Sequence, residues 1–251
     1  MSFGDVVLLV LAGAACGLVN SIAGGGSLIL FPALLLTGLP PLSANVTNSV
    51  ATWPGYVGGV GAFRSEIGER RHLLPPLLAA TLAGSITGCV LLLVTPSSAF
   101  DVVVPVLVLI ATVMTAVQPM VRARLKDSAG ADRRPTVGAI FGVFVATIYG
   151  GYFGGALGVI VLGVLGLTIK DSIRNLNATK SVISLLDASV SVVIFGLFGP
   201  VDWASVLVAA PTCLLGGYLG GSIARRMDET VLRVCVVALG AAVTVALFLR
   251  I

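Results

Sequence analysis

Long apolar stretches, separated by short polar loops, run through the whole chain. Eight of them are present, at residues 5–37, 43–63, 73–95, 101–121, 136–167, 177–198, 204–224 and 230–249. A helix needs about 20 apolar residues to cross the roughly 30 Å of hydrocarbon in a bilayer. Six stretches have that length, whereas 5–37 and 136–167 are too long for one straight helix. The pattern predicts an all-α polytopic membrane protein with eight nominal spans.

Glycine clusters interrupt both of the long stretches near their middle. The first lies at 23–26 (Ala-Gly-Gly-Gly) and the second at 150–155 (Gly-Gly-Tyr-Phe-Gly-Gly). Glycine costs about 1 kcal/mol in a helix interior relative to alanine, and it readily adopts positive φ. Each long stretch is therefore expected to form a glycine-broken helical hairpin, which raises the number of helices to as many as ten. The sequence leaves open whether a hairpin crosses the membrane fully or turns back at mid-depth.

The composition excludes a water-soluble globular protein. Of 251 residues, 57% are hydrophobic and only 10% are charged, and the mean hydropathy is +1.08. A soluble domain has roughly a quarter of its residues charged, so this chain cannot cover an apolar core with a polar shell. The 31 glycines are typical of membrane helices whose backbones pack closely. No disulfide or zinc site is expected, because the four cysteines lie inside apolar stretches without CxxC spacing.

Basic residues gather in alternate loops and predict the orientation. The loops that contain Lys or Arg are 64–71, 122–134, 170–174 and 225–233, and those that contain neither are 38–42, 96–100 and 199–203. If the basic loops face the cytoplasm, thirteen of the fifteen Lys and Arg residues lie there, and Lys180 and Arg250 are left out. This orientation requires each broken stretch to return to the side that it entered. It places both termini outside, and the first apolar stretch is expected in the mature protein because no basic signal region precedes it.

The two halves of the chain repeat each other in opposite orientations. The string Asn-x-Thr-(Asn/Lys)-Ser occurs at 45–49 and again 132 residues later at 177–181, each time after a broken stretch. Equivalent loops alternate in charge: the basic loop 64–72 corresponds to the uncharged loop 199–203. Inverted repeats with broken helices are typical of secondary transporters, which bind substrate at the repeat interface near mid-membrane. The predicted divisions are a first transmembrane repeat at 1–121, a cytoplasmic basic linker at 122–135 and a second, inverted repeat at 136–251.

The glycine breaks and the polar strings beside them are the candidate substrate site. A broken helix frees backbone N–H groups and exposes the positive end of a half-helix dipole, so two such ends would attract an anion. Polar side chains in hydrocarbon need partners or a cavity, and helix capping accounts for only one or two of them. Close packing of small residues is the alternative for any single glycine. The expected binding residues are Gly24, Gly25, Gly26, Ser27, Asn45, Thr47, Asn48, Ser49, Gly154, Gly155, Asn177, Thr179, Lys180 and Ser181.

Two ionisable residues lie inside the stretch 177–198. Lys180 either snorkels to the cytoplasmic interface or supplies a counter-charge to an anion. Asp187 lies two turns further on the same helix face and is the one acid deep in an apolar stretch, which makes it a functional candidate. It is either an ion-pair partner of Lys180 or a proton carrier, and the sequence does not choose between them. No metal or cofactor is expected, and the absence of HExxH and P-loop motifs argues against an enzyme or an ATP-driven pump.

Several motifs resemble one protein family. Val-Asn-Ser-Ile-Ala-Gly-Gly-Gly-Ser at 19–27, Gly-Leu-Pro-Pro at 38–41 and Asn-Val-Thr-Asn at 45–48 resemble the first half of the TauE/SafE family of sulfite and organosulfonate exporters. Gly-Pro-Val-Asp-Trp at 199–203 and the glycine-rich segment 216–226 are similar to its second half. The likeness covers nearly the whole chain. It implies export of small sulfur-containing anions, such as sulfite or sulfoacetate, across a prokaryotic plasma (inner) membrane.

These observations favour a secondary transporter that exports a small sulfur-containing or organic anion by alternating access, with its site at the repeat interface. An anion channel, or a permease for another small anion, is the alternative. Outward movement of an anion is downhill by about 2.3 kcal/mol per charge per 100 mV, so it needs no coupled ion, although Asp187 would allow proton coupling. The expected partners are a small anionic substrate and the lipid bilayer, and not nucleic acid. Direction, coupling ion and homo-oligomeric state stay open.

Overall fold

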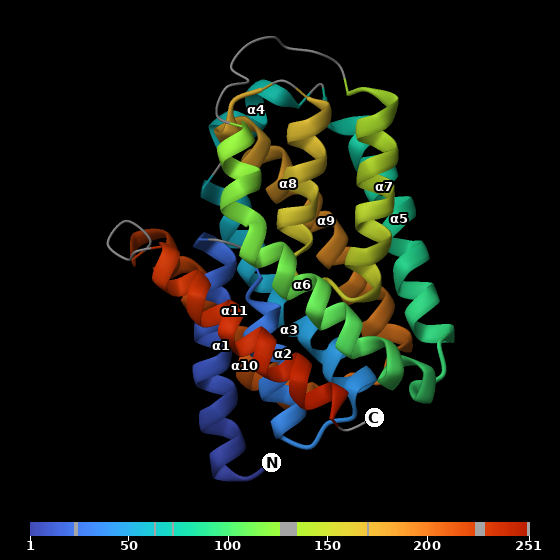
Figure 1. Cartoon of the computed structure of the whole chain (residues 1–251), viewed down its shortest axis with the longest axis vertical. Coiled ribbons are helices and arrows are strands. Elements are labelled where there is room, and N and C mark those ends of the chain that lie inside the picture. Colours follow the sequence, from blue (N-terminus) through green and yellow to red (C-terminus); the bar gives the residue numbers. More distant parts are fainter. Residues whose placement is uncertain are drawn as a thin grey trace.

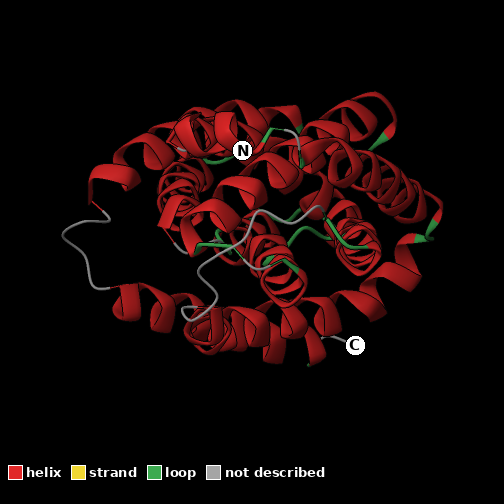
Figure 2. Ribbon diagram, turned by 90° about the horizontal axis from the view of Figure 1, so that it is seen from above, coloured by secondary structure: helices red, strands yellow, loops and turns green. Residues whose placement is uncertain are grey.

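The computed structural model describes residues 1–22, 25–62, 64–71, 73–125, 135–169, 171–223 and 229–249. These residues form eleven helices and no strand, which confirms the predicted all-α class (Figure 2). The helices are α1 (Phe3–Ile22), α2 (Ser27–Leu36), α3 (Pro41–Ala62), α4 (Arg64–Arg70), α5 (Leu74–Val94), α6 (Ser97–Leu125), α7 (Val137–Tyr152), α8 (Leu157–Thr168), α9 (Ile173–Phe198), α10 (Trp203–Ile223) and α11 (Glu229–Phe248). Stretches of α1, α5, α6 and α9 are long and apolar enough to cross a membrane. The chain is a multi-pass membrane protein.

Two helices differ from the pattern of apolar stretches. Arg64–Arg70, which lies in an expected loop, forms the short helix α4, and Glu66 in its first turn is favourable at the positive end of a helix. Helix α6 has 29 residues and extends beyond the apolar stretch 101–121 at both ends. Hydropathy detects only the part of a helix that lies in hydrocarbon, so polar ends of a long, tilted helix escape it.

The two glycine-broken stretches form hairpins that turn back in the middle of the molecule. Gly25 and Gly154 have φ values of 91° and 75°, and Ala156 follows with a φ of 58°, so the chain reverses through left-handed backbone that favours glycine. Helix α2 has 10 residues and α8 has 12, which correspond to rises of about 15 and 18 Å. Both are about half as long as the hydrocarbon is thick. Figure 1 shows α2 and α8 leading from the centre of the molecule toward opposite ends, so the returning arm of each hairpin is too short to cross the hydrocarbon by itself.

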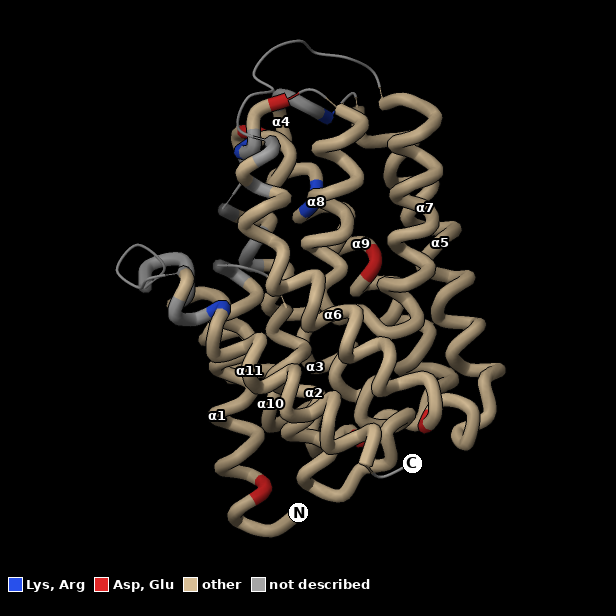
Figure 3. Tube along the Cα trace, viewed as in Figure 1, with Lys and Arg blue, Asp and Glu red and all other residues tan. Residues whose placement is uncertain are grey.

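The two ends of the molecule differ in the segments that they hold. The N- and C-termini lie together at one end, and α4 lies at the other, with the starts of α7 and α9 (Figure 1). In the part of the chain that the structure describes, Figure 3 shows acidic and no basic positions around the termini, whereas basic positions occur toward α4. This asymmetry agrees with the placement of both termini on one side of the membrane. That this side is the outside stays a prediction.

Each hairpin packs against a helix from the other half of the chain. Helix α1 lies along α10, and α7 lies along α5. A Cβ atom at Gly17 would collide with the carbonyl oxygen of Cys213, and one at Gly88 would collide with the carbonyl oxygen of Ile148. The missing side chains therefore allow backbone-to-backbone contact along both seams, as small residues do in membrane helix pairs.

Helices α3 and α9 pack against each other between these two seams, and α6 pairs with α11. The hairpins also meet directly: the rings of Phe31 in α2 and Phe153 after α7 have an edge-to-face arrangement, with centroids 5.6 Å apart. One core cluster is built from α5, α7, α8 and α9, with members such as Leu77, Val143 and Leu162. The fold thus brings α3, α9 and both hairpin turns to one central place.

Candidate functional site

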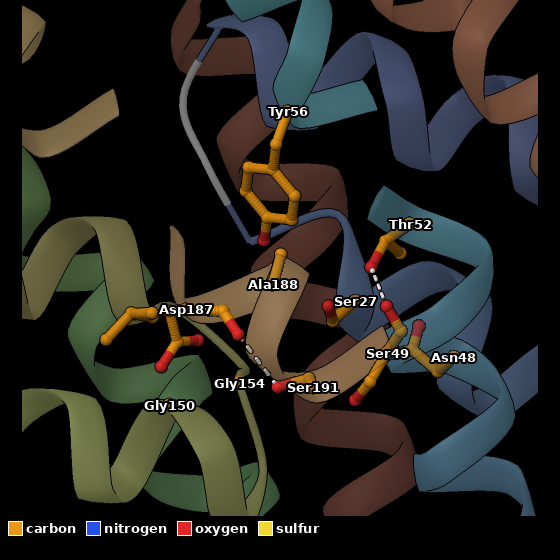
Figure 4. Close-up of a pocket in the computed structure, with 11 residues that line it drawn as sticks. Ser27, Asn48, Ser49, Thr52, Tyr56, Gly150, Gly154, Asp187, Ala188 and Ser191 are labelled. Carbon is orange, nitrogen blue, oxygen red and sulfur yellow. Dashed lines mark hydrogen bonds between the residues drawn. The ribbon is translucent and has the colours of Figure 1, made fainter. Parts of the chain in front are cut away.

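A buried polar cavity lies where α3, α9 and the two hairpins meet (Figure 4). It has a free volume of about 20 Å³, which is enough for one water molecule. Its lining combines hydroxyl groups, one amide, one carboxylate and two glycines, and contains no Lys, Arg or His among the described residues. The lining residues are Ser27, Asn48, Ser49, Thr52, Tyr56, Gly150, Gly154, Leu157, Asp187, Ala188 and Ser191.

Helical spacing explains why these side chains share a cavity. Asn48, Thr52 and Tyr56 follow one another at intervals of four residues on α3, so they lie on one face of that helix. Asp187 and Ser191 have the same spacing on α9. The two central helices therefore present one polar stripe each, and α3 and α9 turn these stripes toward the cavity (Figure 4).

Asp187 is held on two sides by helices α5 and α7. Its Oδ1 accepts a hydrogen bond of 2.6 Å from the Ser85 hydroxyl, and its side chain is only 4% exposed. A Cβ atom at Gly150 would approach Oδ1 to 2.8 Å and Oδ2 to 2.9 Å, so glycine is needed for the carboxylate to reach α7. The Ser191 hydroxyl donates to the backbone carbonyl of Asp187 at 3.0 Å. The position of the acid is fixed by its neighbours.

The Lys180 side chain lies beside the first turn of α8. Its Cδ, Cε and Nζ atoms come within 3.6 to 3.7 Å of the place where a Cβ of Gly158 would be, beside the first turn of α8. Its side chain is half-buried, and it does not line the cavity. The partner that the structure gives to the Asp187 carboxylate is Ser85. The role of Lys180 as a counter-charge stays a prediction.

The polar string at 45–49 is divided between the cavity and the surrounding helices. Asn48 and Ser49 line the cavity, and the amide oxygen of Asn48 has no hydrogen-bond partner among the described residues, although the side chain is 2% exposed. Asn45 donates from Nδ2 to the carbonyl oxygen of Tyr152 at 2.9 Å. Thr47 accepts a hydrogen bond of 3.0 Å from the backbone N–H of Asp202. Asn45 and Thr47 therefore connect α3 to other segments.

The second polar string lies outside this cavity. Thr179 donates to the carbonyl of Asn175 at 3.1 Å, and Ser181 donates to the carbonyl of Asn177 at 2.8 Å, so both hydroxyls bond within their own helix. Asn177, Thr179 and Ser181 are half-buried rather than buried. Their sequence equivalence to the first string does not bring them into the cavity, and a part in substrate binding stays a prediction.

The glycines of the first hairpin shape the turn more than the cavity. Gly24 lies outside the described residues. Gly25 has the positive φ, and the N–H of Gly26 donates to Oδ1 of Asn20 at 2.8 Å. Ser27, the first residue of α2, reaches the cavity. The backbone at this turn is thus set by Gly25 and Gly26, and Ser27 is the residue next to the turn that lines the cavity.

In the second hairpin, Gly154 lines the cavity and Gly155 does not. A Cβ atom at Gly155 would approach the Phe153 ring to 2.7 Å and the Cβ of Ala111 to 3.0 Å. Gly155 therefore allows α6 to lie close to the turn. For Gly155 the structure therefore favours close helix packing, the alternative to substrate binding that the sequence left open.

Several cavity residues were absent from the sequence prediction. Thr52 and Tyr56 continue the spacing of Asn48 at four-residue intervals, so the periodicity of α3 could have identified them. Ser191 stands in the same relation to Asp187. Ser85 has no such signal, because it comes from α5 and meets Asp187 only through tertiary packing. The remaining additions are Gly150, Leu157 and Ala188.

The sequence of the chain is similar to one family model and to several membrane proteins. A family model described as "Sulfite exporter TauE/SafE" matches residues 9–247. A probable membrane transporter protein of Haemophilus influenzae is 26% identical over 92% of this chain and 90% of its own length. The probable membrane transporter proteins ORF9 of a Sinorhizobium species and YfcA of Escherichia coli are each 25% identical, over 98% and 92% of this chain and 94% and 85% of their own lengths. No solved structure matches the chain.

Proposed function

Because the chain belongs to the sulfite exporter TauE/SafE family of membrane transporters, we propose that it is a secondary transporter that exports a small sulfur-containing anion. Sulfite, sulfoacetate and similar organosulfonates form the proposed substrate class, and a prokaryotic plasma membrane is the proposed location. The observation that carries the proposal is the buried polar cavity at the meeting point of two broken hairpins and two central helices. Transporters with broken helices bind their substrates at such a point.

The helix contacts support an inverted repeat. If α1 corresponds to α7 and α10 to α5, the contact of α1 with α10 becomes the contact of α7 with α5, and both exist. If α3 likewise corresponds to α9, the contact of α3 with α10 becomes the contact of α9 with α5, and both of these also exist. In Figure 1, α1 leads away from the end that holds the termini and α7 leads toward it. An approximate two-fold axis in the membrane plane accounts for these exchanges.

Alternating access then takes place between two mixed bundles rather than between the two halves of the sequence. One bundle comprises α1, α2, α3 and α10, and the other comprises α5, α7, α8 and α9, which share their own core cluster. The cavity lies between the bundles, with Tyr56 on one and Asp187 on the other. A space of about 20 Å³ is too small for a sulfonate, so binding requires the bundles to separate.

Two hydrogen bonds cross from one bundle to the other in the closed arrangement, and an ion pair joins α9 to α4, which belongs to neither bundle. Trp53 donates from Nε1 to the Ser189 hydroxyl at 2.9 Å, and Asn45 donates to Tyr152 O. At the α4 end, Arg174 forms an ion pair with Glu66. Such bonds can break and re-form as the cavity opens, whereas the glycine seams of α1 with α10 and of α5 with α7 keep each bundle rigid.

The N-terminal ends of α2 and α8 supply the proposed attraction for an anion. Ser27 and Leu157 are the first residues of these helices, and both line the cavity. Helix N-termini carry about half a positive charge and exposed N–H groups, so two of them favour an anion without a Lys or Arg side chain. Asp187 is the proposed coupling residue, because it is the one charge-bearing group in the described lining.

Flux measurements on the purified protein in proteoliposomes test this function. Substrate-loaded vesicles that contain the protein should release sulfite or sulfoacetate faster than substrate-loaded vesicles without the protein. External substrate should accelerate that release by exchange. Asn48→Ala should slow release by about tenfold, because a buried hydrogen-bonding group is lost. Asn175→Ala, which changes the same residue type outside the cavity, is the matched control. Equal flux in both variants, or no sulfonate flux in the unaltered protein, would contradict the proposal. Conductance without exchange stimulation would favour the anion channel.

A further inference from the structure

The charge pattern of the cavity points to a more specific substrate class than a simple anion. Asp187 lies in the cavity wall with no Lys, Arg or His among the described lining residues. Among the described residues, the titratable side chains close enough to interact with it electrostatically are Tyr56 on α3 and Cys89 on α5, and both residue types are uncharged at neutral pH. A buried carboxylate without a cationic neighbour and an anionic ligand would repel each other in one small cavity.

The carboxylate also retains unused capacity to accept hydrogen bonds. Ser85 donates to its Oδ1, and its Oδ2 receives no hydrogen bond from a described residue. A carboxylate has about four lone-pair positions, so one donor leaves most of them unfilled. A ligand that brings several donors and a positive charge would satisfy this side of the cavity.

The opposite side of the cavity has a different character. Figure 4 shows Asp187 beside Gly150 and Gly154 on one side, and Ser27, Ser49 and Asn48 on the other. Ser27 begins α2, so that side lies at the positive end of a half-helix and carries hydroxyl groups. The Asn48 amide, whose oxygen has no hydrogen-bond partner in the described part of the chain, can turn to present either N–H or C=O groups to a ligand. The cavity therefore has a carboxylate on one side and, on the other, hydroxyl groups at the start of α2.

We infer that the site selects a zwitterion, a small sulfonate that carries an ammonium group. The ammonium group faces Asp187, and the sulfonate faces Ser27, Ser49 and the N-terminus of α2. This inference rests on the proposed function and narrows its substrate class. The positive charge opposite Asp187 could also come from a bound proton or a sodium ion that accompanies a plain sulfonate, and the experiment distinguishes these sources.

Two ligands of equal length provide the test. Binding of 2-aminoethanesulfonate and of ethanesulfonate to the purified full-length protein is measured by calorimetry. The measurements are made with and without sodium ions and at several values between about pH 5 and pH 8, a range in which histidine is the only side chain that normally titrates. The amino ligand is expected to bind at least about tenfold more tightly, and Asp187→Asn is expected to abolish that preference while leaving sulfonate binding in place. Asp101→Asn, an exposed acid on α6, is the matched control and should keep the preference.

The possible outcomes separate this inference from the function on which it rests. Equal affinity for the two ligands would overturn the zwitterion and leave the sulfonate transporter standing. Tight binding of ethanesulfonate that needs low pH or sodium ions, and loses that need in Asp187→Asn, would also overturn it, because a proton or metal ion then supplies the charge. If neither ligand binds, the proposed function itself fails. Ser85→Ala covers the case in which Asp187→Asn does not fold, since it keeps the carboxylate and should reduce the preference only partly.

Discussion

The hydroxyl of Ser85 donates a hydrogen bond of 2.6 Å to Oδ1 of Asp187, across 102 residues of sequence. Ser85 is fully buried on α5, and Asp187 is 4% exposed on α9. The bond therefore joins two helices of one bundle at the wall of the cavity. Because a buried carboxylate is costly without a donor, this contact orients the acid toward the cavity and supports its presence there.

Loss of the Ser85 hydroxyl should weaken both stability and transport. Ser85→Ala removes a hydrogen bond to a charged group, which contributes about 1.5–3 kcal/mol. We expect a lower melting temperature and slower release of sulfonate from proteoliposomes. Thr87→Ala is the control, since the Thr87 hydroxyl bonds to the carbonyl of Ala83 at an exposed site on the same helix. If both variants behave alike, the contact has no special role.

A methyl group at Gly150 should displace Asp187. In Gly150→Ala the new Cβ would lie 2.8 Å from Oδ1 and from Cδ2 of Leu157, so the carboxylate or the helix must move. Helix propensity alone would stabilise the protein by about 1 kcal/mol, which makes the expected loss of flux, about tenfold or more, diagnostic of the contact. Gly61→Ala has open space around its Cβ and is the matched control. Flux that rises or stays constant in Gly150→Ala would show that the acid tolerates another position.

The Glu66–Arg174 ion pair should make the α4 end sensitive to acid. The hydroxyl of Ser65 donates to Glu66 at 2.7 Å, and with the nearby Arg174 guanidinium it holds the pKa of Glu66 below its ordinary value of 4.5. A lowered pKa in the folded protein means that the stabilisation is complete above about pH 4.5 and is lost as the pH falls through the folded-state pKa. In Glu66→Gln this stabilisation is absent at every pH.

Thermal unfolding profiles between pH 7 and pH 3 test the ion pair, a range that spans the ordinary titration of a glutamate. The unaltered protein should lose more of its melting temperature on acidification than Glu66→Gln does, and the two curves should approach each other at low pH. Glu66→Gln should also open the α4 end more readily at neutral pH, seen as faster exchange flux. Parallel curves across the whole range would mean that the pair contributes nothing measurable.

The topology predicts that both termini are accessible from one side, the outside. Charge asymmetry between the loops places the basic segments in the cytoplasm, and the structure places the termini at the end opposite α4 (Figure 1). Reporter domains fused to either terminus should be active only outside the cytoplasm. A reporter inserted between 126 and 134 should show the opposite pattern. Termini that report opposite sides would contradict the prediction that each hairpin returns to the side that it entered.

The candidate site shows how far local sequence patterns extend. Asn48, Ser49 and Asp187 were predicted from polar groups in apolar surroundings, and Ser27 and Gly154 from the glycine breaks; all five line the cavity. Thr52 and Tyr56 follow from helical periodicity. Ser85 does not, because a serine in an apolar helix has the same local appearance whether it bonds its own carbonyls or a distant carboxylate. The string at 177–181 repeats the first in letters, yet none of its residues lines the cavity.

The sequence by itself determined the all-α membrane class, the two glycine breaks, the family and the deep position of Asp187, because hydropathy, backbone freedom and burial of charge act within one stretch of chain. Only the tertiary structure decided that each hairpin packs on a helix of the other half and that Ser85 reaches Asp187. These features depend on contacts between segments about 100 residues or more apart, and such contacts are settled by side-chain packing over the whole molecule rather than by any local preference.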